Sequence, residues 1–227
     1  MSGEETYAGG KKQVFYSVFD GSFRTRVPEG FPDALVRVNK NNKEVHERMV
    51  PALFGIIENV EFEESDYGKR IKITLDANDE GAYPVISMGV ESKDGRDFLR
   101  KLPAIDLSKE VRFMPYKFTP DDSDQERSGI SITQRDPNDQ FTLKVENYFW
   151  DKEKTEYKHG HPSIDYDTAK ESERKIYLIQ RDEFLLDYAI KNVLPKFQNS
   201  PARSAPDPLD TVLNEKKDNI NPDDIPF

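Results

Sequence analysis

A long series of short β-type segments, running from Gln13 to about Trp150, is the feature that most constrains the fold. Runs of about four to eight residues rich in Val, Ile, Phe and Tyr alternate with turn-forming clusters, which is typical of strands. The runs lie at 13–19, 22–27, 34–38, 44–49, 53–62, 69–76, 82–90, 110–118, 128–134 and 140–150. This pattern predicts a mainly β domain.

One helical segment interrupts this series, at residues 92–102. Ser92 or Asp94 is a suitable N-cap, and Phe98, Leu99 and Leu102 form a short apolar face. Three strands, a helix and further strands follow one another, which is the element order of the OB-fold, a five-stranded barrel. We therefore predict an OB-fold-like barrel with added N-terminal strands. An immunoglobulin-like sandwich is the alternative, but the inserted helix and the missing Cys-Trp-Cys pattern disfavour it.

The C-terminal third changes character. Thr168 and Glu171 have the spacing of a capping box. Apolar residues then recur at helical spacing, which predicts a helix near 182–196 that packs on the barrel as a lid; they are Phe184, Leu185, Tyr188, Ala189, Val193 and Leu194. Residues 175–179 could instead form a short strand. We expect three parts: a disordered segment 1–12, a domain 13–197 and a flexible acidic tail 198–227, which is rich in Pro, Asn, Asp and Ser.

The charge balance is acidic, with a formal net charge of -10. Between Asn199 and Phe227 there are six acidic and three basic residues, so the body still carries most of the excess. Because nucleic-acid binding usually needs a basic surface, any such site must be a local basic groove in which base stacking contributes much of the affinity. The chain has no cysteine, no apparent signal peptide and no long apolar segment, so we expect a cytoplasmic protein with no membrane contact.

The last residues read Asn-Pro-Asp-Asp-Ile-Pro-Phe and end at Phe227. This ending resembles the C-terminal tip of bacterial single-stranded DNA-binding proteins (SSB), whose tails end in Asp residues followed by Ile-Pro-Phe. A partner pocket can bury the Phe227 ring while a basic residue pairs with the terminal carboxylate. Pro226 limits the entropy lost on docking, Ile225 adds apolar area, and Asp223 and Asp224 direct the tip toward a basic surface.

The resemblance implies the function. It implies a phage-encoded protein, acting in the bacterial host cytoplasm, that binds and protects single-stranded DNA during replication, recombination and repair. Its tail would recruit a polymerase, primase, helicase, nuclease or recombination mediator through residues 223–227. The longer body and a linker that is not Gly/Gln-rich depart from the bacterial family, so its tetrameric assembly is not carried over. An accessory protein that uses the tail without binding DNA is one alternative.

A candidate DNA-binding face follows from the alternation of side chains along the strands. In 69–76, for example, Ile71, Ile73 and Leu75 oppose Arg70, Lys72 and Thr74. We expect the cationic and aromatic residues opposite the apolar sets to share one sheet face, where cations follow phosphates and rings stack on bases. These residues are Arg70, Lys72, Tyr83, Arg112, Tyr116, Phe118, Lys144, Tyr148 and Trp150.

Catalytic chemistry has no clear signature in the chain. His159 and His161 flank Gly160, and Asp165 could complete a metal site, but a plain surface loop is the simpler interpretation. There is no phosphate-cradling glycine motif and no Gly-x-Ser-x-Gly elbow. We therefore expect no enzyme activity, no cofactor and no bound metal. A metal-dependent nuclease built from scattered carboxylates stays as a further alternative.

Overall fold

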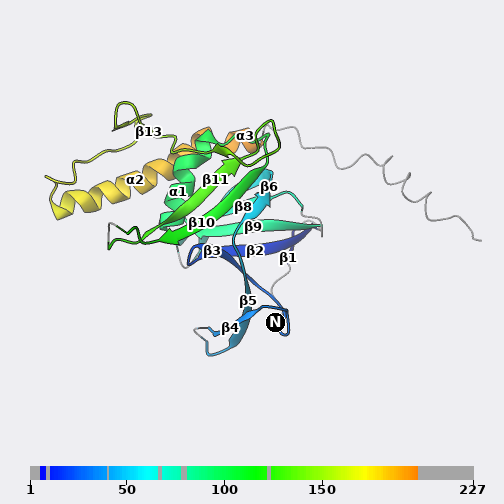
Figure 1. Cartoon of the computed structure of the whole chain (residues 1–227). Coiled ribbons are helices and arrows are strands. Elements are labelled where there is room, and N and C mark those ends of the chain that lie inside the picture. The colour runs from blue at the N-terminus through cyan, green and yellow to red at the C-terminus, as the bar shows by residue number, and fades with distance from the viewer. Residues whose placement is uncertain are drawn as a thin grey trace, which may run out of the picture. The chain divides into compact units, whose positions relative to one another are not determined.

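A computed structural model describes residues 6–8, 11–39, 41–65, 68–77, 81–121 and 124–198, and it is mainly β (Figure 1). The chain divides into two units, Met1–Phe197 and Gln198–Phe227. Within the described part, no helix combines the length and the apolar character needed to cross a membrane.

The largest of the three sheets, called the large sheet below, has eight strands, and β2 pairs in parallel with β9 at its centre. The strands follow the order β4-β5-β3-β2-β9-β8-β7, and β1 pairs with β2. Their bounds are Thr6–Ala8 (β1), Lys11–Phe19 (β2), Ser22–Arg26 (β3), Leu35–Val38 (β4), Glu44–Val50 (β5), Ile57–Ser65 (β7), Gly68–Leu75 (β8) and Ala82–Gly89 (β9).

The smaller sheet has four strands in the order β12-β11-β10-β6, and a third sheet pairs β13 with β14. The bounds are Leu53–Gly55 (β6), Val111–Phe118 (β10), Arg127–Gln134 (β11), Leu143–Lys144 (β12), Trp150–Asp151 (β13) and Glu156–Tyr157 (β14). Strand pairing within the described residues does not join these sheets into a closed barrel.

A sharp bend links the two larger sheets. β6 pairs with β10 while β7 pairs with β8, and Ile56 alone separates β6 from β7. Asp76 fixes the bend, because its Oδ1 accepts from the Ile56 N–H (2.7 Å) and its own N–H donates to the Ile56 carbonyl (2.9 Å). Gly55 has φ +148°, and a Cβ there would lie 2.5 Å from Asp76 Oδ1. Glycine is therefore required where the chain passes from one sheet to the other.

The core contains the apolar faces of both sheets and one face of each long helix. Fully buried residues include Phe23, Ile71 and Ile86 from the large sheet and Phe113 and Ile132 from the small one. The alternation predicted for 69–76 is confirmed, since Ile71, Ile73 and Leu75 are buried. Burial of this apolar surface is the main driving force for packing the two sheets together.

Helix α1 (Lys93–Lys101) lies along the open edge of β11, ahead of a short 3-10 turn η1 (Leu102–Ala104). Ser92 is its N-cap and accepts from the Gly95 N–H (3.0 Å), as one of the two predicted caps. Asp97 Oδ2 accepts from the Ile130 N–H (2.9 Å) and Lys101 Nζ donates to the Ile130 carbonyl (2.6 Å). The helix thus satisfies strand backbone groups that an exposed edge would leave unpaired.

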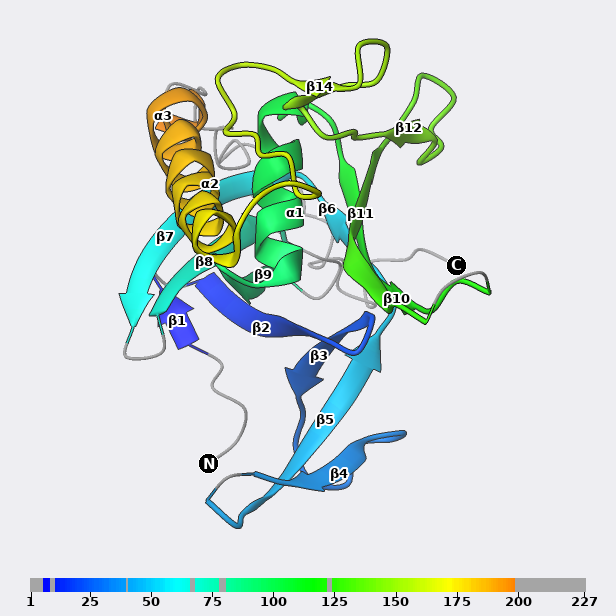
Figure 2. The same ribbon diagram turned by 90° about the vertical axis from the view of Figure 1, so that its left-hand side faces the viewer.

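Helix α2 (Glu171–Asn192) packs beside α1 and is followed by the short α3 (Leu194–Gln198), as Figure 2 shows. Its buried face carries Tyr177, Arg181, Leu185 and Ala189. Asp182 joins the two helices, because it pairs with Arg96 of α1 (2.6 Å). The predicted C-terminal helix is confirmed, but it begins at Glu171, and its N-cap is Lys170, whose N–H donates to Glu173, so the capping box expected for Thr168 and Glu171 is wrong.

Three segments differ from the sequence interpretation. Residues 140–150 do not form the predicted strand, and only the two-residue β12 and Trp150 of β13 are extended there. The reason is two Asx turns. Asp136 Oδ1 accepts from the N–H groups of Asn138 and Gln140, and Asn147 Oδ1 accepts from the Phe149 N–H. Residues 175–179 are helical. β1 and the start of β2 lie within the segment 1–12, for which disorder is the prediction.

Candidate nucleic-acid interface

The outer face of the large sheet, opposite the core, carries three of the nine predicted DNA-binding residues. Arg70 and Lys72 lie on β8 and Tyr83 lies on β9. Side chains that are paired in register point to the same face of a sheet, so Lys72 shares its face with Ser87 and Tyr83 shares its face with Gln13. The N-terminal strands β2 and β3 continue this face.

One row of registered residues crosses four strands of this face. Lys72 is opposite Ser87, Ser87 is opposite Ser17, and Ser17 is opposite Arg24. Neighbouring strands lie about 4.8 Å apart, so the row spans roughly 14 Å. We call these four residues the serine strip: two small hydroxyl side chains between a cation at each end.

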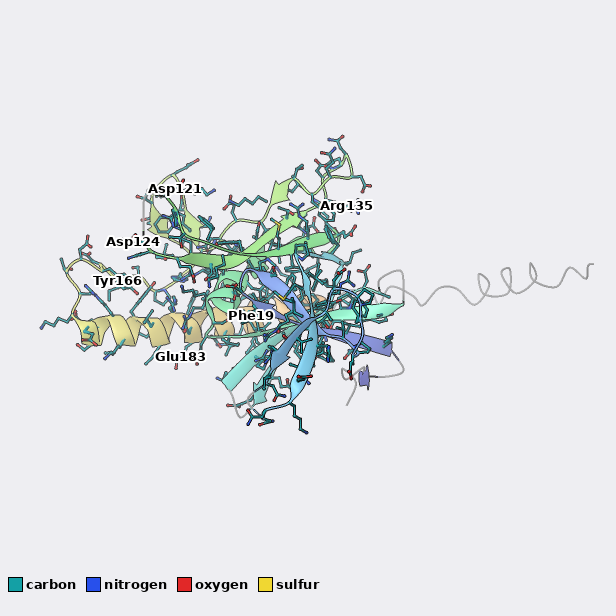
Figure 3. The ribbon with its side chains drawn as sticks, turned by 60° about the horizontal axis from the view of Figure 1, so that its bottom comes forward. Phe19, Asp121, Asp124, Arg135, Tyr166 and Glu183 are labelled. Atoms are coloured by element: carbon teal, nitrogen blue, oxygen red, sulfur yellow. The ribbon has the colours of Figure 1, made fainter. Side chains whose placement is uncertain are left out.

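Two phenylalanine rings border the serine strip. Alternation along β2 places Phe15 and Phe19 on the same face as Ser17, two residues to either side of it. Lys72 Nζ lies 5.9 Å from the centre of the Phe15 ring, and the Arg24 guanidinium lies 4.3 Å from the centre of the Phe19 ring. Phe19 is 50% exposed, so its ring is accessible to a ligand; Figure 3 labels the residue.

The cations of this face are partly neutralised, because Glu63 and Glu61 of β7 are opposite Arg70 and Lys72 in register. Arg70 Nε donates to Ser87 Oγ (3.0 Å), and no carboxylate of the described residues forms an ion pair with Arg70. Lys72 pairs with the half-exposed Glu63 (2.8 Å). Arg24 lies 3.4 Å from the buried Glu47, which accepts two shorter hydrogen bonds from Arg37. Solvent-exposed ion pairs contribute little free energy, so a phosphate can replace Glu63 at small cost.

Four other predicted residues lie on the small sheet. Arg112, Tyr116 and Phe118 share the outer face of β10, and Lys144 is opposite Thr133 of β11 on that face. Phe118 is 50% exposed. The Tyr116 hydroxyl and Asp97 Oδ2 both lie close to Gly129, because a Cβ added to Gly129 would be 2.6 Å from each of them. Burial and the charges of Asp97 and Asp94 raise the pKa of Tyr116.

A second aromatic–cation cluster lies at the far end of β10. The Phe54 and Phe141 rings are 5.2 Å apart, and the guanidinium groups of Arg112 and Arg135 lie 5.8 and 4.7 Å from the Phe141 ring centre. Figure 3 shows Arg135 at the opposite end of this sheet from Asp121 and Asp124 of the β10–β11 hairpin. Arg135 pairs with Glu110 and Asp139, so much of its charge is already compensated.

Tyr148 and Trp150 lie neither on the large sheet nor on the small one. Tyr148 stacks on His159 with ring centres 4.4 Å apart, and its hydroxyl accepts from that of Tyr188 on α2 (3.4 Å). Trp150 packs edge-on against Tyr157 at 5.0 Å. The idea that all nine residues share one face is therefore wrong: they fall into three groups, because β10 and β8 belong to different sheets and the chain after β12 turns toward α2.

His161 lies in the same aromatic cluster, where it is 6% exposed and stacks on Tyr157 at 4.2 Å. Its Nδ1 donates to the Pro162 carbonyl (2.6 Å), and its Nε2 has no hydrogen-bond partner in the described part of the chain. Burial, together with Arg100 and Arg181, lowers the pKa of His161. The surface-loop interpretation is therefore wrong for His161, and the described residues contain no cluster of three metal-ligating side chains.

Two parts of the candidate site need separate mention. The tail residues Asp223, Asp224, Ile225, Pro226 and Phe227 lie outside the described residues. Phe15 and Phe19 were not among the sequence-predicted residues, and Arg24 is a cation of the N-terminal hairpin whose simpler interpretation from sequence is solvated charge. The alternation of Phe15, Ser17 and Phe19 against Val14, Tyr16 and Val18 is visible in the sequence, but the parallel pairing of β2 with β9, which brings them beside Lys72, is not.

Comparison with known proteins gave no relatives: no family model, no curated protein and no solved structure matches the chain.

Proposed function

We propose that the chain binds single-stranded DNA on the outer face of the large sheet. The observation that carries this proposal is the serine strip, with Phe15 and Phe19 beside its cations. Arg70, Lys72 and Arg24 would contact phosphates, and the Ser87 hydroxyl, which accepts from Arg70, can donate to a phosphate oxygen. The small serine side chains leave room for the strand between the rings, on which bases stack without regard to sequence.

An OB-fold-like barrel is the architecture we propose for the body. The bent strand β6–β7 pairs with β8 on one side and β10 on the other, and α1 lies between β9 and β10 in the chain. The order of these elements supports the assignment, because it is the strand and helix order of the OB-fold. The sheet faces of OB-folds commonly bind oligonucleotides. In this assignment β8 and β9, which carry Arg70, Lys72 and Tyr83, are the second and third barrel strands.

Recruitment of replication and repair enzymes is the second half of the proposal. It rests on the sequence of residues 223–227, in which an aromatic ring, a terminal carboxylate and two acidic residues stand together. Because the binding face and the tip are separate parts of the chain, the protein could hold DNA and present its tip to a partner at once. Arg112, Tyr116, Phe118 and Lys144 of the small sheet stay candidates for additional DNA contacts.

A titration with labelled oligo-dT and with duplex of equal length, at two salt concentrations, tests the proposal. We expect tighter binding to the single strand, with a shallow salt dependence. Three neutralised phosphates correspond to a slope of about −2 in a plot of log K against log salt. Equal affinity for duplex, or no binding at either salt concentration, would refute it, and loss of the oligonucleotide on adding a divalent metal would favour the nuclease alternative.

A further inference from the structure

The edge strand β4 is the most apolar exposed part of the large sheet. Leu35, Val36 and Val38 are 59%, 56% and 61% exposed. Figures 1 and 2 both show β4 and the adjoining half of β5 as an arm that projects from the body. Edge strands in soluble proteins are usually protected by charges, proline or a covering element, and an unprotected edge invites pairing with another strand.

The backbone of β4 offers hydrogen bonds outward. The Asn39 N–H donates to the Lys43 carbonyl (2.9 Å), and bonded and non-bonded pairs alternate along an antiparallel ladder. The groups of Leu35 and Arg37 therefore face β5, and those of Val36 and Val38 face outward. The His46 carbonyl supports this assignment, because His46 is opposite Val36 and its carbonyl accepts from the Val27 N–H (3.0 Å) on the side away from β4.

We propose that a second copy of this chain covers the edge, through antiparallel β4–β4 pairing about a two-fold axis at Val36. Val36 of one copy then exchanges two hydrogen bonds with Val36 of the other. Each Val38 N–H donates to the Ala34 carbonyl across the axis, and Leu35 lies opposite Arg37. The next register, with Val36 opposite Val38, would place the two Arg37 side chains directly opposite each other, which is unfavourable.

Charge complementarity favours a second copy as the occupant. In the proposed register, Glu44 and Val38 of one copy are in the same row as Ala34 and Arg48 of the other, with Glu44 and Arg48 at its two ends. On the opposite face, Arg37 of one copy lies two strand spacings, about 10 Å, from Glu47 of the other, and each Glu47 also holds the Arg37 of its own copy. The charged residues of each row are opposite in sign and about 10 to 14 Å apart, so the pairing brings no like charges face to face, and the two-fold axis repeats each row.

Other occupants fit the arm less well. Arg37 is the one cation of β4, and Glu47 already holds it through two hydrogen bonds (2.7 and 2.8 Å), so nucleic acid finds little free positive charge there. A competing dimer surface exists on α2, where Ile176, Ile179 and Ile190 are 54%, 60% and 44% exposed. Glu183 lies within that row at helical spacing (Figure 3), which would place a carboxylate in the contact.

Sedimentation of the full chain from sub-micromolar to high-micromolar concentration tests the inference, with the variant Val36→Pro. Proline removes the outward N–H of Val36, which makes no bond to β5, so the monomer should fold normally. We expect dimers for the unmodified chain and an association at least about tenfold weaker for V36P, since two hydrogen bonds are lost. The matched variant Val36→Thr keeps the N–H and the branched side chain and should remain dimeric.

Two results would overturn the inference. One is a monomer at every concentration for the unmodified chain. The other is a dimer that survives Val36→Pro but is lost in Ile179→Lys, which would place the contact on α2. Circular dichroism of V36P checks that the arm is intact. Oligo-dT binding, measured on the same variants, reports on the serine strip separately, because the strip does not include β4.

Discussion

The guanidinium of Arg24 on β3 lies 4.3 Å from the centre of the Phe19 ring on β2. Phe19 is the last residue of its strand and is half exposed, and Arg24 ends the serine strip. A cation held beside an accessible ring lets one nucleotide use both groups, its base on the ring and its phosphate on the cation. This pair links the sequence pattern of the N-terminal hairpin to the proposed DNA interface.

Replacing Phe19 with alanine should weaken oligo-dT binding about 5- to 150-fold, because stacking of one base contributes about 1–3 kcal/mol. Stability should change little, since half of the ring is already in water. Fluorescence anisotropy measures the affinity, and Phe54→Ala is the matched control, because Phe54 is 48% exposed on the small sheet. A larger loss for F54A than for F19A would move the interface to the small sheet.

Trp150, the single tryptophan, provides a built-in probe. Because its ring packs on Tyr157 in the β13–β14 hairpin and not on the strip, single-stranded DNA should leave its emission almost unchanged. In a chain with Phe19→Trp and Trp150→Phe, the tryptophan emission should instead be quenched on titration with oligo-dT, since bases stack on the new indole. Strong quenching of Trp150 with no response from Trp at position 19 would contradict the assignment.

His161 should make stability depend on pH between about 7 and 5. Its folded-state pKa is lowered by burial and by Arg100 and Arg181, so the unfolded chain binds the proton more readily. Stability is therefore full above the unfolded value of 6.5 and falls as pH drops through it toward the folded pKa. Urea unfolding at both pH values measures this, and His161→Phe should flatten the difference; an unchanged slope in H161F would assign it to other groups.

The tail has a prediction of its own. Removing Phe227 deletes the ring and shifts the terminal carboxylate, so it should abolish capture of purified enzymes that bind SSB tails. Affinity for oligo-dT should stay equal or rise, because the strip is untouched and the tail is acidic. Pull-down with the full and truncated chains tests both statements. Unchanged enzyme capture by the truncated chain would exclude the role given to the tip.

Much of the fold follows from local sequence patterns. Period-two alternation locates β8 within one residue at each end, and it correctly assigns Ile71, Ile73 and Leu75 to the core. The Ser92 cap and the apolar face of α1 are equally local. These features are predictable because they depend on side chains a few residues apart.

Features that depend on distant partners were not predictable in the same way. The parallel β2–β9 pairing is one example, and the burial of Tyr148 against α2 is another. A ring on a strand looks the same in sequence whether a helix covers it or water does, so Tyr148 and Phe19 could not be told apart. The candidate interface was therefore half found from the sequence: its cations on β8 were identified, and its rings on β2 were not.

The most direct test of the strip removes its two terminal cations. The double variant Arg24→Ala, Lys72→Ala should bind oligo-dT at least about tenfold more weakly and reduce the salt slope by about 1.4, because two phosphate contacts are lost. The control Lys175→Ala, Lys191→Ala removes the same charge from α2, where both lysines are in exposed ion pairs, and should bind as the unmodified chain does. Equal loss in both variants, or none in the strip variant, would contradict the account.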